Sequence, residues 1–390
     1  MTKARIRVVI APDSFKGALF ADEVARAIAR GLQRCPSVQW DLHLLPMADG
    51  GEGTGIVVRS LGGQPVSAEA ESIYGVPSAA HWTRWGDKAL VEAAVGSGFL
   101  PENARQADGE HTTSRGTGLL VAAALADASV DEVFVALGGT GSTDGGMGFL
   151  HALGAQFLDK AGRPLLPYGA NLDQVAQYIP VGPLPKPLIG LYDVGVPLLG
   201  ERGAVYQFGP QKGVAAHRLA AMDAAMAQYA ALVDPLGTAV HAPGAGAAGG
   251  MGFAILACGG RLQGGAETVG EWCQLDRHVA DADWVITGEG QIDRQTTEGK
   301  VVAWVLHCAQ ARKRPVIALA GSRARDLTLL HGQGLTFAMP IGLAPMSLPA
   351  AIAQTAESLE AASEEIGWFL GQSVLSAVHQ KGVNNVQLDT

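Results

Sequence analysis

Cysteine and lysine are both scarce in this sequence, and each scarcity narrows the choice of function. The cysteines form no CxxC pair and have no histidine at metal-ligand spacing, which excludes a cysteine–histidine zinc site and a disulfide scaffold. We therefore expect reduced thiols, most of them in the core, in a cytoplasmic protein. The four cysteines are Cys35, Cys258, Cys273 and Cys308.

Long apolar runs and blocks of basic residues are absent as well. No stretch approaches the roughly 20 apolar residues of a membrane span, and the apolar run before Pro12 is too short for a signal peptide. The formal net charge is −9, and no cluster of lysine or arginine is present to displace counterions from a nucleic acid. We expect neither a membrane nor a nucleic-acid partner, and a few placed cations must hold any anionic ligand.

The chain is long enough for two domains. Its 390 residues are more than one ordinary hydrophobic core accommodates. The composition, 48% hydrophobic and 17% charged, is typical of a well-packed globular protein. The β-branched run 5–11 predicts a strand, and the i, i+4, i+8 spacing of Val24, Ile28 and Leu32 is typical of a surface helix. A second strand follows at about 40–48, so this β-α-β order predicts an α/β fold with parallel strands.

The pattern changes after Gly62. Apolar and polar residues alternate over 64–98 between turn signals, which predicts an antiparallel meander with one solvated face. The α/β pattern then resumes, and the chain is expected to finish in one long helix at 347–370. Further strands are expected at 187–194, 283–290, 314–322 and 335–342.

This organisation predicts two α/β domains. Residues 1–62 and 282–390, from both ends of the chain, form a parallel-sheet domain of the Rossmann or flavodoxin-like type. Residues 63–281 form a second α/β domain with a mixed sheet, inserted into the first.

Glycine-rich loops recur where the predicted strands end, and each contains a carboxylate, a hydroxyl or a lysine. Ligands of open α/β sheets bind beyond the carboxyl ends of the strands, and glycine turns at helix starts direct N–H groups at anions such as phosphate. Lys16, Lys212 and Lys300 each adjoin a glycine in such a loop. The loops are APDSFKG, MADGGEGTG, LGGTGSTDGGMG, DVGVPLLGERGA, FGPQKG, PGAGAAGGMG and TGEGQIDRQTTEGK.

Carboxylates supply the other half of this pattern. Phosphoryl transfer needs carboxylates for Mg²⁺, cations for the developing charge and a base near the attacking hydroxyl. Each acid beside a glycine is also a candidate for an Asx turn or a helix cap. We interpret the glycines of 138–148 as slim backbone that lets a phosphate or sugar acid touch N–H groups. The acids are Asp13, Asp49, Glu52, Asp144, Asp193, Glu289 and Asp293.

Other nucleotide motifs are weak or missing. No GxxxxGK[ST] motif exists, since Val301 follows the Gly299–Lys300 pair. One GxGxxG occurs at 244–249, with Glu267 near the expected acidic distance, but the segment before it is a poor strand. A nicotinamide-dependent oxidoreductase acting on a small hydroxy acid therefore stays open as an alternative.

Two further features are ambiguous. The pentapeptide GGMGF occurs at 145–149 and again at 249–253, each time before an apolar helical stretch, and chance similarity explains it as well as duplication does. The histidines have no evident aspartate partner for a nucleophilic triad, which indicates surface or core positions. They are His81, His111, His151 and His307.

The loops above, taken in order and joined by TTSRGTG at 112–118, resemble the bacterial ATP-dependent glycerate kinases that form 2-phosphoglycerate. The resemblance runs nearly end to end. It implies a two-domain α/β enzyme that binds Mg²⁺, ATP and D-glycerate in a cleft between its domains. This chain departs from the family pattern at 141–144 and at Tyr192, which bears on the acceptor more than on the reaction.

The resemblance also implies roles for individual residues. It does not decide which acid is the base and which binds the metal, or whether the protein is a monomer or a homodimer. A 3-phosphoglycerate product is a less favoured alternative. A non-catalytic sugar-acid-binding protein is a further alternative. The implied residues are Lys16, Asp49, Asp193 and Lys212 for catalysis; Ser14, Ser114, Arg115 and Asp144 for the substrate; Gly139, Gly141, Gly145, Gly288, Glu289 and Gly290 for the nucleotide; and Asp49, Glu52, Asp193 and Asp293 for Mg²⁺.

Overall fold

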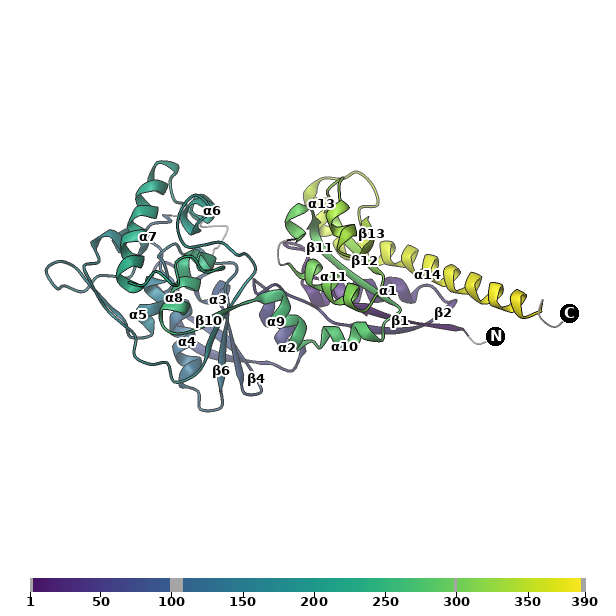
Figure 1. Cartoon of the computed structure of the whole chain (residues 1–390), viewed down its shortest axis with the longest axis horizontal. Helices are drawn as coiled ribbons and strands as arrows, with labels where there is room; N and C mark the ends of the chain where they lie inside the picture. The colour runs from purple at the N-terminus through teal and green to yellow at the C-terminus, as the bar shows by residue number, and fades with distance from the viewer. Residues whose placement is uncertain (1–2, 99–107, 298–299, 387–390) are drawn as a thin grey trace. The chain divides into compact units, whose positions relative to one another are not determined.

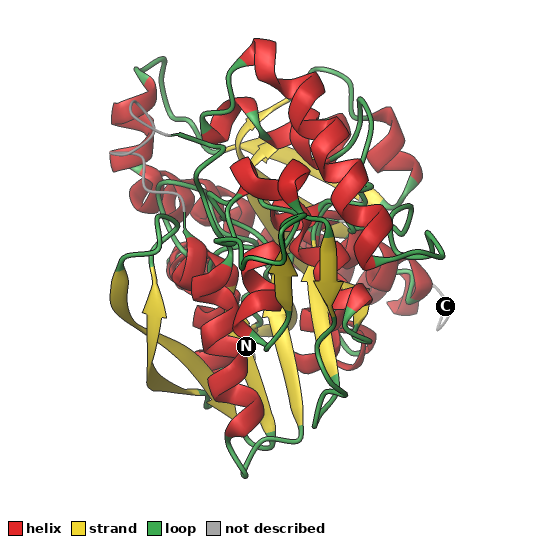
Figure 2. Ribbon diagram, turned by 90° about the vertical axis from the view of Figure 1, so that its left-hand side faces the viewer, coloured by secondary structure: helices red, strands yellow, loops and turns green. Residues whose placement is uncertain are grey.

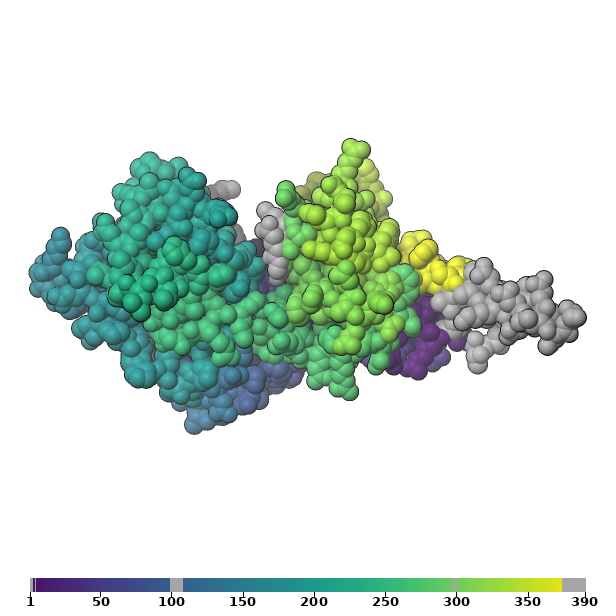
Figure 3. Space-filling view, viewed as in Figure 1, coloured from purple at the N-terminus to yellow at the C-terminus, as the bar shows by residue number. Residues whose placement is uncertain are grey.

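Two compact units make up the computed structural model, which describes residues 3–98, 108–297 and 300–386 (Figure 1). Unit 1 comprises Met1–Ala48 and Val269–Thr390, and unit 2 comprises Asp49–Thr268. In Figure 3, where the colour follows residue number, unit 1 therefore contains the purple start and the green-to-yellow end of the colour bar, and unit 2 contains its blue and teal middle. Both ends of the chain contribute to one unit, and the segment between them forms the other.

The unit boundaries differ from the predicted divisions at 62/63 and 281/282. Helix α2 (Thr54–Ser60) contacts β4 (Pro77–Trp85) and β5 (Lys88–Glu92), so it belongs to unit 2. Helix α10 (Leu275–Ala280) contacts α11 (Val301–Ala311), so it belongs to unit 1. The packing of these two short helices sets the boundaries, and no composition change marks it in the sequence.

Unit 1 is built on a parallel sheet with the strand order β13-β12-β11-β1-β2. When the strands of this unit alone are numbered along the chain, the order from the β2 edge is 2-1-3-4-5, which is the flavodoxin-like order. The predicted parallel-sheet, flavodoxin-like fold is thus confirmed. The strands are β1 (Ala4–Ile10), β2 (Val38–Leu44), β11 (Trp284–Ile292), β12 (Val316–Arg323) and β13 (Leu335–Pro340).

Helix α1 (Ala21–Gln33) covers this sheet with the predicted apolar stripe. Val24, Ile28 and Leu32 are fully buried. On its other side α1 packs against α14 (Thr355–Val386), so closely that a Cβ added at Gly31 would lie 2.2 Å from a carbonyl oxygen of α14.

The single long helix expected at 347–370 is wrong in detail. Helix α13 (Leu348–Ala353) ends before Gln354, and α14 begins at Thr355 and continues to Val386. The hydroxyl of Thr355 donates to the carbonyl of Ala351, which joins the two helices at the break. The remaining helices of this region are α9 (Gly265–Trp272), which leads from unit 2 into unit 1, and α12 (Thr328–Gly332).

Unit 2 is built on a mixed sheet with the order β10-β9-β6-β5-β4-β3. Figure 2 draws the strands of the protein in yellow and its helices in red. The four strands β10, β9, β6 and β5 are parallel, and β5, β4 and β3 form the predicted antiparallel meander. Because β3 and β5 are both antiparallel to β4, they end at the same edge of the sheet. The strands not yet delimited are β3 (Gln64–Glu71), β6 (Glu132–Ala136), β9 (Leu188–Tyr192) and β10 (Arg261–Gly264).

Helices and a short hairpin complete unit 2. The core includes the fully buried Tyr229, Phe149 and Phe253, and the ring of Tyr229 lies against the rings of Phe253 and Phe157. The helices are α3 (Ala93–Ser97), α4 (Arg115–Ala126), α5 (Met147–Ala152), α6 (Ala204–Phe208), α7 (Leu219–Val233) and α8 (Met251–Ala257), and the hairpin is β7 (Gln156–Leu158) with β8 (Gln177–Ile179).

The four cysteines carry free thiols, three of them buried. Burial raises the pKa of the Cys273 thiol to about 11, so this group is a core side chain rather than a reactive thiolate. Among the described helices, none has the length and hydropathy that a membrane crossing requires.

Candidate functional site

The carboxyl ends of β1 and β11 bring several predicted site residues of unit 1 together. In the loop after β1, the N–H of Asp13 donates to the carbonyl of Gly288 over 2.8 Å. A Cβ added at Gly290 would lie 3.6 Å from the backbone nitrogen of Lys16. The strand order of this sheet reverses between β1 and β11, and open α/β sheets bind ligands at such a switch point.

The charged groups at this switch point differ in solvent exposure and in ion pairing. Glu289 is only 7% exposed; it accepts a 2.7 Å hydrogen bond from the hydroxyl of Thr296 and lies 3.8 Å from the Nζ of Lys300. Lys16 is exposed and makes no ion pair with any residue that the structure describes. Ser14 lies beside it, with its N–H held by the Asp13 carboxylate at 2.6 Å. This edge therefore offers one unpaired cation and a neighbouring hydroxyl.

Gly288 and Asp293 serve the local structure of β11. A Cβ at Gly288 would lie 2.3 Å from the carbonyl oxygen of Leu319, so the neighbouring strand requires glycine here. The N–H of Asp293 donates to the Thr296 hydroxyl over 3.1 Å, which starts the turn after the strand. Close strand packing, rather than access for a cofactor, accounts for the glycine at 288.

In unit 2, the turn at 49–53 lies across the ends of three parallel strands. A Cβ at Gly138, after β6, would lie 2.4 Å from the Cα of Gly51. A Cβ at Gly50 would lie 3.0 Å from both the Cβ of Leu191, in β9, and the Cα of Gly265, after β10. These contacts place the predicted acids of this turn at the end of the strand that leads into Asp193.

The acids of this turn are held differently. The Asp49 carboxylate accepts the N–H of Gly51 at 3.0 Å, whereas Glu52 is exposed. The N–H of Gly53 donates to Glu92, the last residue of β5, at 3.1 Å. Glu92 was not predicted as a site residue, because its strand was expected in an antiparallel meander and not among the parallel strands whose carboxyl ends bind ligands.

Asp144 and Ser114 lie inside the protein, which corrects their expected contact with a substrate. Neither has exposed surface. The Asp144 carboxylate accepts the N–H and the hydroxyl of Ser114 at 2.7 and 2.8 Å and the N–H groups of Gly148 and Gly146 at 3.0 and 3.2 Å. Burial raises its pKa above the ordinary value, and these four donors oppose the shift. Asp144 thus ties the start of α4 to the start of α5.

Lys212 is also buried, with 5% of its surface exposed. Its Nζ donates to the carbonyl of Ser142 at 2.8 Å. Burial lowers its pKa to about 8, and the charge of Asp144 partly opposes that shift. In this structure the ammonium group binds the glycine-rich loop, and very little of the residue's surface is open to a phosphate.

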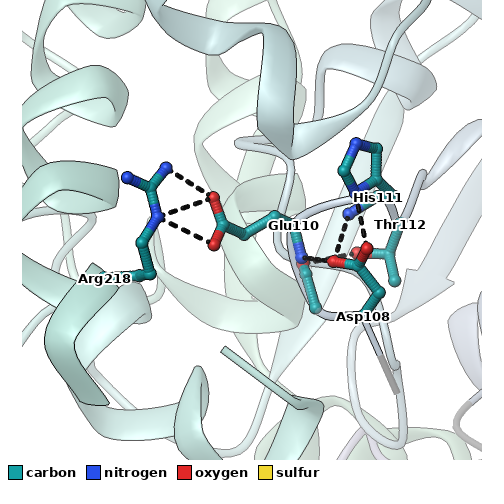
Figure 4. A network of polar contacts seen from close by, with 6 residues as sticks. Asp108, Glu110, His111, Thr112 and Arg218 are labelled. Carbon is teal, nitrogen blue, oxygen red and sulfur yellow. Dashed lines mark hydrogen bonds and ion pairs between the residues drawn. The ribbon is translucent and has the colours of Figure 1, made fainter. Parts of the chain in front are cut away.

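Two ion pairs hold the loop 108–113 that precedes α4 (Figure 4). Arg218 donates to both carboxylate oxygens of Glu110, with distances of 2.8 to 3.3 Å. His111 and Asp108 form a second pair at 2.6 Å, so His111 does have an aspartate partner, contrary to expectation. A Cβ at Gly109 would lie 2.7 Å from the carbonyl oxygen of Lys212, so the loop is pressed onto the segment that carries this lysine.

Arg115, the first residue of α4, is a predicted site residue whose charged group is partly exposed. Its Nη1 forms an ion pair with Glu71 at the end of β3, and its side chain is 28% exposed. Its Nε donates to Nδ1 of His151 in α5 at 3.4 Å. Neither Glu71 nor His151 was predicted as a partner of Arg115 from the sequence.

The loop between β6 and α5 is rich in glycine because it packs closely against other segments of the protein, and not because a ligand must reach its N–H groups as expected. The N–H of Gly141 donates to the carbonyl of Ser97 at 2.9 Å and that of Gly145 donates to Gly249 at 3.0 Å. A Cβ at Gly139 would lie 2.9 Å from the Cβ of Ala94. These N–H groups and Cβ positions are occupied by the protein itself, so they are not open to a nucleotide phosphate.

The GxGxxG at 244–249 is not a dinucleotide-binding turn. No residue of the described segment 234–246 is in a strand, although the motif requires a strand before its first glycine. A Cβ at Gly246 would lie 2.2 Å from the carbonyl oxygen of Pro197, and one at Gly249 would lie 2.0 Å from that of Ser142. Protein atoms fill the space that a pyrophosphate would need.

The donor set is compatible with Mg²⁺ bound to a nucleotide. Within the described residues, no three histidine, cysteine or acidic side chains gather into a group that could hold a metal alone. Mg²⁺ usually keeps several waters and takes one or two carboxylates together with substrate phosphates. The turn with Asp49 and Glu52, which lies at the end of β9, fits that requirement.

In both α/β units, predicted acids lie beyond the carboxyl ends of parallel strands, which is where open α/β sheets bind their ligands. The sequence model of the glycerate kinase family matches residues 8–370, and this chain belongs to that family.

Its relatives agree with this assignment over nearly their whole length. Glycerate kinase of Bacillus subtilis (strain 168) is 37% identical over 373 residues, which cover 93% of this chain and 97% of the relative. Glycerate 2-kinase of Escherichia coli (strain K12) is 37% identical over 344 residues, with 85% and 89% covered. A crystal structure of a candidate glycerate kinase 2 from Salmonella typhimurium LT2 matches with a TM-score of 0.78 and 35% identity, covering 94% of this chain and 99% of that one.

Proposed function

We propose that this protein transfers the γ-phosphoryl group of Mg-ATP to the 2-hydroxyl of D-glycerate and forms 2-phosphoglycerate. The observation that carries the proposal is the family match over residues 8–370, which includes both sets of strand-end loops. The Escherichia coli relative, named glycerate 2-kinase, supports the 2-position over the 3-position.

Roles in unit 1 follow from the switch point between β1 and β11. Lys16 is the exposed cation there, and we assign it to a phosphate. Ser14 would donate its hydroxyl to the same ligand. Glu289 and Gly290 complete this edge, Glu289 through its contacts with Thr296 and Lys300.

Roles in unit 2 follow from the turn at 49–53 and the end of β9. Asp49, Glu52 and Asp193 are the acids assigned to Mg²⁺ or to the base that receives the proton of the acceptor hydroxyl. Bound Mg²⁺ would neutralise charge on the phosphoryl oxygens. Arg115 is assigned to the acceptor carboxylate, because a planar guanidinium matches two carboxylate oxygens. Asp293 of unit 1 stays a further candidate for the metal.

Buried residues act on the site indirectly in this proposal. Lys212, Ser114 and Asp144 hold the glycine-rich loop and the start of α4, which carries Arg115. Their replacement should therefore disturb folding before it disturbs any single step of the reaction.

The test is ATP consumption by the purified protein with D-glycerate and Mg²⁺, followed by phosphorus NMR of the product. We expect a 2-phosphoglycerate signal that disappears in Lys16→Ala and Asp193→Asn, both of which should fold. A 3-phosphoglycerate signal would overturn the position, and ADP release no faster than without glycerate would overturn the substrate. Glycerate binding without ATP use would instead favour the non-catalytic alternative.

The proposal also includes a setting for the enzyme. We infer a cytoplasmic protein that acts as a monomer or a homodimer on a small molecule and has no nucleic-acid partner, in line with the net charge of −9. Light scattering coupled to size exclusion measures the mass in solution, and retention on a nucleic-acid column at physiological salt would contradict the last point.

A further inference from the structure

The guanidinium of Arg115 donates hydrogen bonds to the protein from Nε and Nη1, while its other N–H groups donate to no residue that the structure describes. Of its five N–H donors, one on Nε faces His151 Nδ1 and one on Nη1 faces Glu71. Nη2 donates to no residue that the structure describes. Two partners from different elements therefore fix the plane of this group and leave a pair of outward donors on Nη1 and Nη2.

His151 is held as the neutral partner of this group. Burial lowers its pKa below the ordinary value, the charge of Arg115 lowers it further, and Glu71 acts in the opposite direction. Helix α5 also packs against α8, which contains no ionisable residue. Because the Nε of Arg115 donates to Nδ1 of His151, the neutral ring accepts this bond at Nδ1 and carries its proton on Nε2.

We propose that His151 and Glu71 are positioning residues for Arg115 and that they aim its open donors at the carboxylate of the acceptor hydroxy acid. This inference rests on the proposed function. A carboxylate binds best to two parallel N–H donors of a guanidinium, so affinity depends on the orientation of that plane. Protonation of Nδ1 removes the acceptor for Nε and places a second cation against Arg115, which turns the plane away and weakens acceptor binding.

A purely structural role would give a different result. The same contacts link β3, α4 and α5, and a structural tie would affect the melting temperature and all kinetic constants together. A positioning role affects the Michaelis constant for glycerate selectively and makes it depend on pH. The kinetic constants of one set of variants at two pH values therefore separate the two roles.

The variants are His151→Asn and His151→Leu, with His217→Asn as the control. The Oδ1 of asparagine is as many bonds from Cα as Nδ1 of histidine is, and it accepts a hydrogen bond without titrating in this range. Leucine removes the acceptor. His217 is an exposed histidine of the same unit.

We expect the wild-type KM for D-glycerate to rise about fivefold from about pH 7.5 to about pH 5.5, while KM for ATP stays within about twofold. His151→Asn should keep the neutral value and lose the rise. His151→Leu should show a KM about tenfold higher at both pH values, since one lost charge-assisted bond is worth roughly that factor. The control His217→Asn should follow the wild type, and Glu71→Ala should also raise KM for glycerate selectively.

Calorimetric titration of D-glycerate into the same proteins separates this inference from the proposed function. If the wild type phosphorylates glycerate and all variants share its pH profile, the positioning role is wrong and the function stands. If glycerate binds without being phosphorylated, the function falls, and the measured affinities of the variants still decide the positioning role. If glycerate neither binds nor reacts, both are overturned. Circular dichroism melting identifies a variant that fails to fold.

Discussion

At the scale of single residues, Asp144 shows how a carboxylate in a glycine-rich loop can be structural. Its four hydrogen bonds join the starts of α4 and α5, and none of its surface is exposed. Asp144 was singled out from the sequence as a substrate-binding residue, whereas in the structure its carboxylate accepts hydrogen bonds from the protein itself. A ligand and a buried helix start both require an acid beside glycines, so the sequence alone does not separate them.

Asp144→Ala should lower the free energy of unfolding by roughly 3 to 5 kcal/mol, because buried donors would lose their acceptor. Urea unfolding followed by circular dichroism measures the loss. The control is Asp127→Ala, since the Asp127 carboxylate accepts the N–H and the hydroxyl of Ser129 in a surface turn. A loss at Asp144 no larger than the loss at Asp127 would contradict the structural role.

Lys212 provides a second test at this scale, through pH. Its pKa is lowered from 10.5 to about 8 in the folded protein by burial. Between these values the unfolded chain binds more protons than the folded one, so the contribution of Lys212 to stability rises with pH. The rise should approach roughly 3 kcal/mol between about pH 8 and about pH 10.5.

The comparison is between the wild type and Lys212→Met, measured by urea unfolding at several pH values. Subtracting the two removes groups that titrate alike in both proteins. We expect the advantage of the wild type over Lys212→Met to grow as the pH rises above about 8. A difference that stays constant or shrinks would show that the folded ammonium group is not destabilised by burial.

At the scale of elements, the two GGMGF copies are explained by packing. The N–H of Gly145 donates to the carbonyl of Gly249, and α5 and α8, which the copies begin, contact each other. Each helix starts after a glycine with positive φ, Gly146 at 72° and Gly250 at 102°. The repeat therefore reflects two similar turns that press their backbones together, which no spacing in the sequence indicates.

Gly250→Ala tests this interpretation. Its φ of 102° is unfavourable for alanine, and the new Cβ would lie 2.5 Å from the Cα of Gly145. We expect a loss of roughly 3 kcal/mol or more, since the backbones must move apart. The matched control is Gly237→Ala, where φ is 65° and nothing lies within 4 Å. That variant should lose about 1 kcal/mol, and equal losses would show that conformation alone, without close packing, requires glycine at 250.

At the scale of the whole molecule, local pattern predicted more than long-range packing did. The strand predicted at 187–194 is β9, the meander is present, and the flavodoxin-like sheet is confirmed, because these depend on periods of two or 3.6 residues. Glu92 and the Glu71–Arg115 pair were missed, since only the sheet order brings their segments together. The helix break at Gln354 was missed because alanine-rich sequence on both sides of it favours helix.

The insertion of unit 2 into unit 1 leads to the last prediction. A core cluster of unit 2 draws all of its residues from within Asp49–Thr268, and its sheet is made entirely of strands in this range. The two ends of the range are adjacent, because a Cβ at Gly265 would lie 1.9 Å from the carbonyl oxygen of Asp49. The excised segment would therefore begin and end at neighbouring points of its own fold, without long unpacked termini.

We expect the excised segment 49–268, about 220 residues long, to fold cooperatively on its own. Its measures are a single thermal transition in circular dichroism and resistance to a dilute protease. The control is the same segment with Gly250→Ala, which should melt at a lower temperature if the excised core packs as it does in the full chain. A segment with helical signal but no cooperative transition would mean that unit 2 needs unit 1 to fold, and the two units would then form one folding domain.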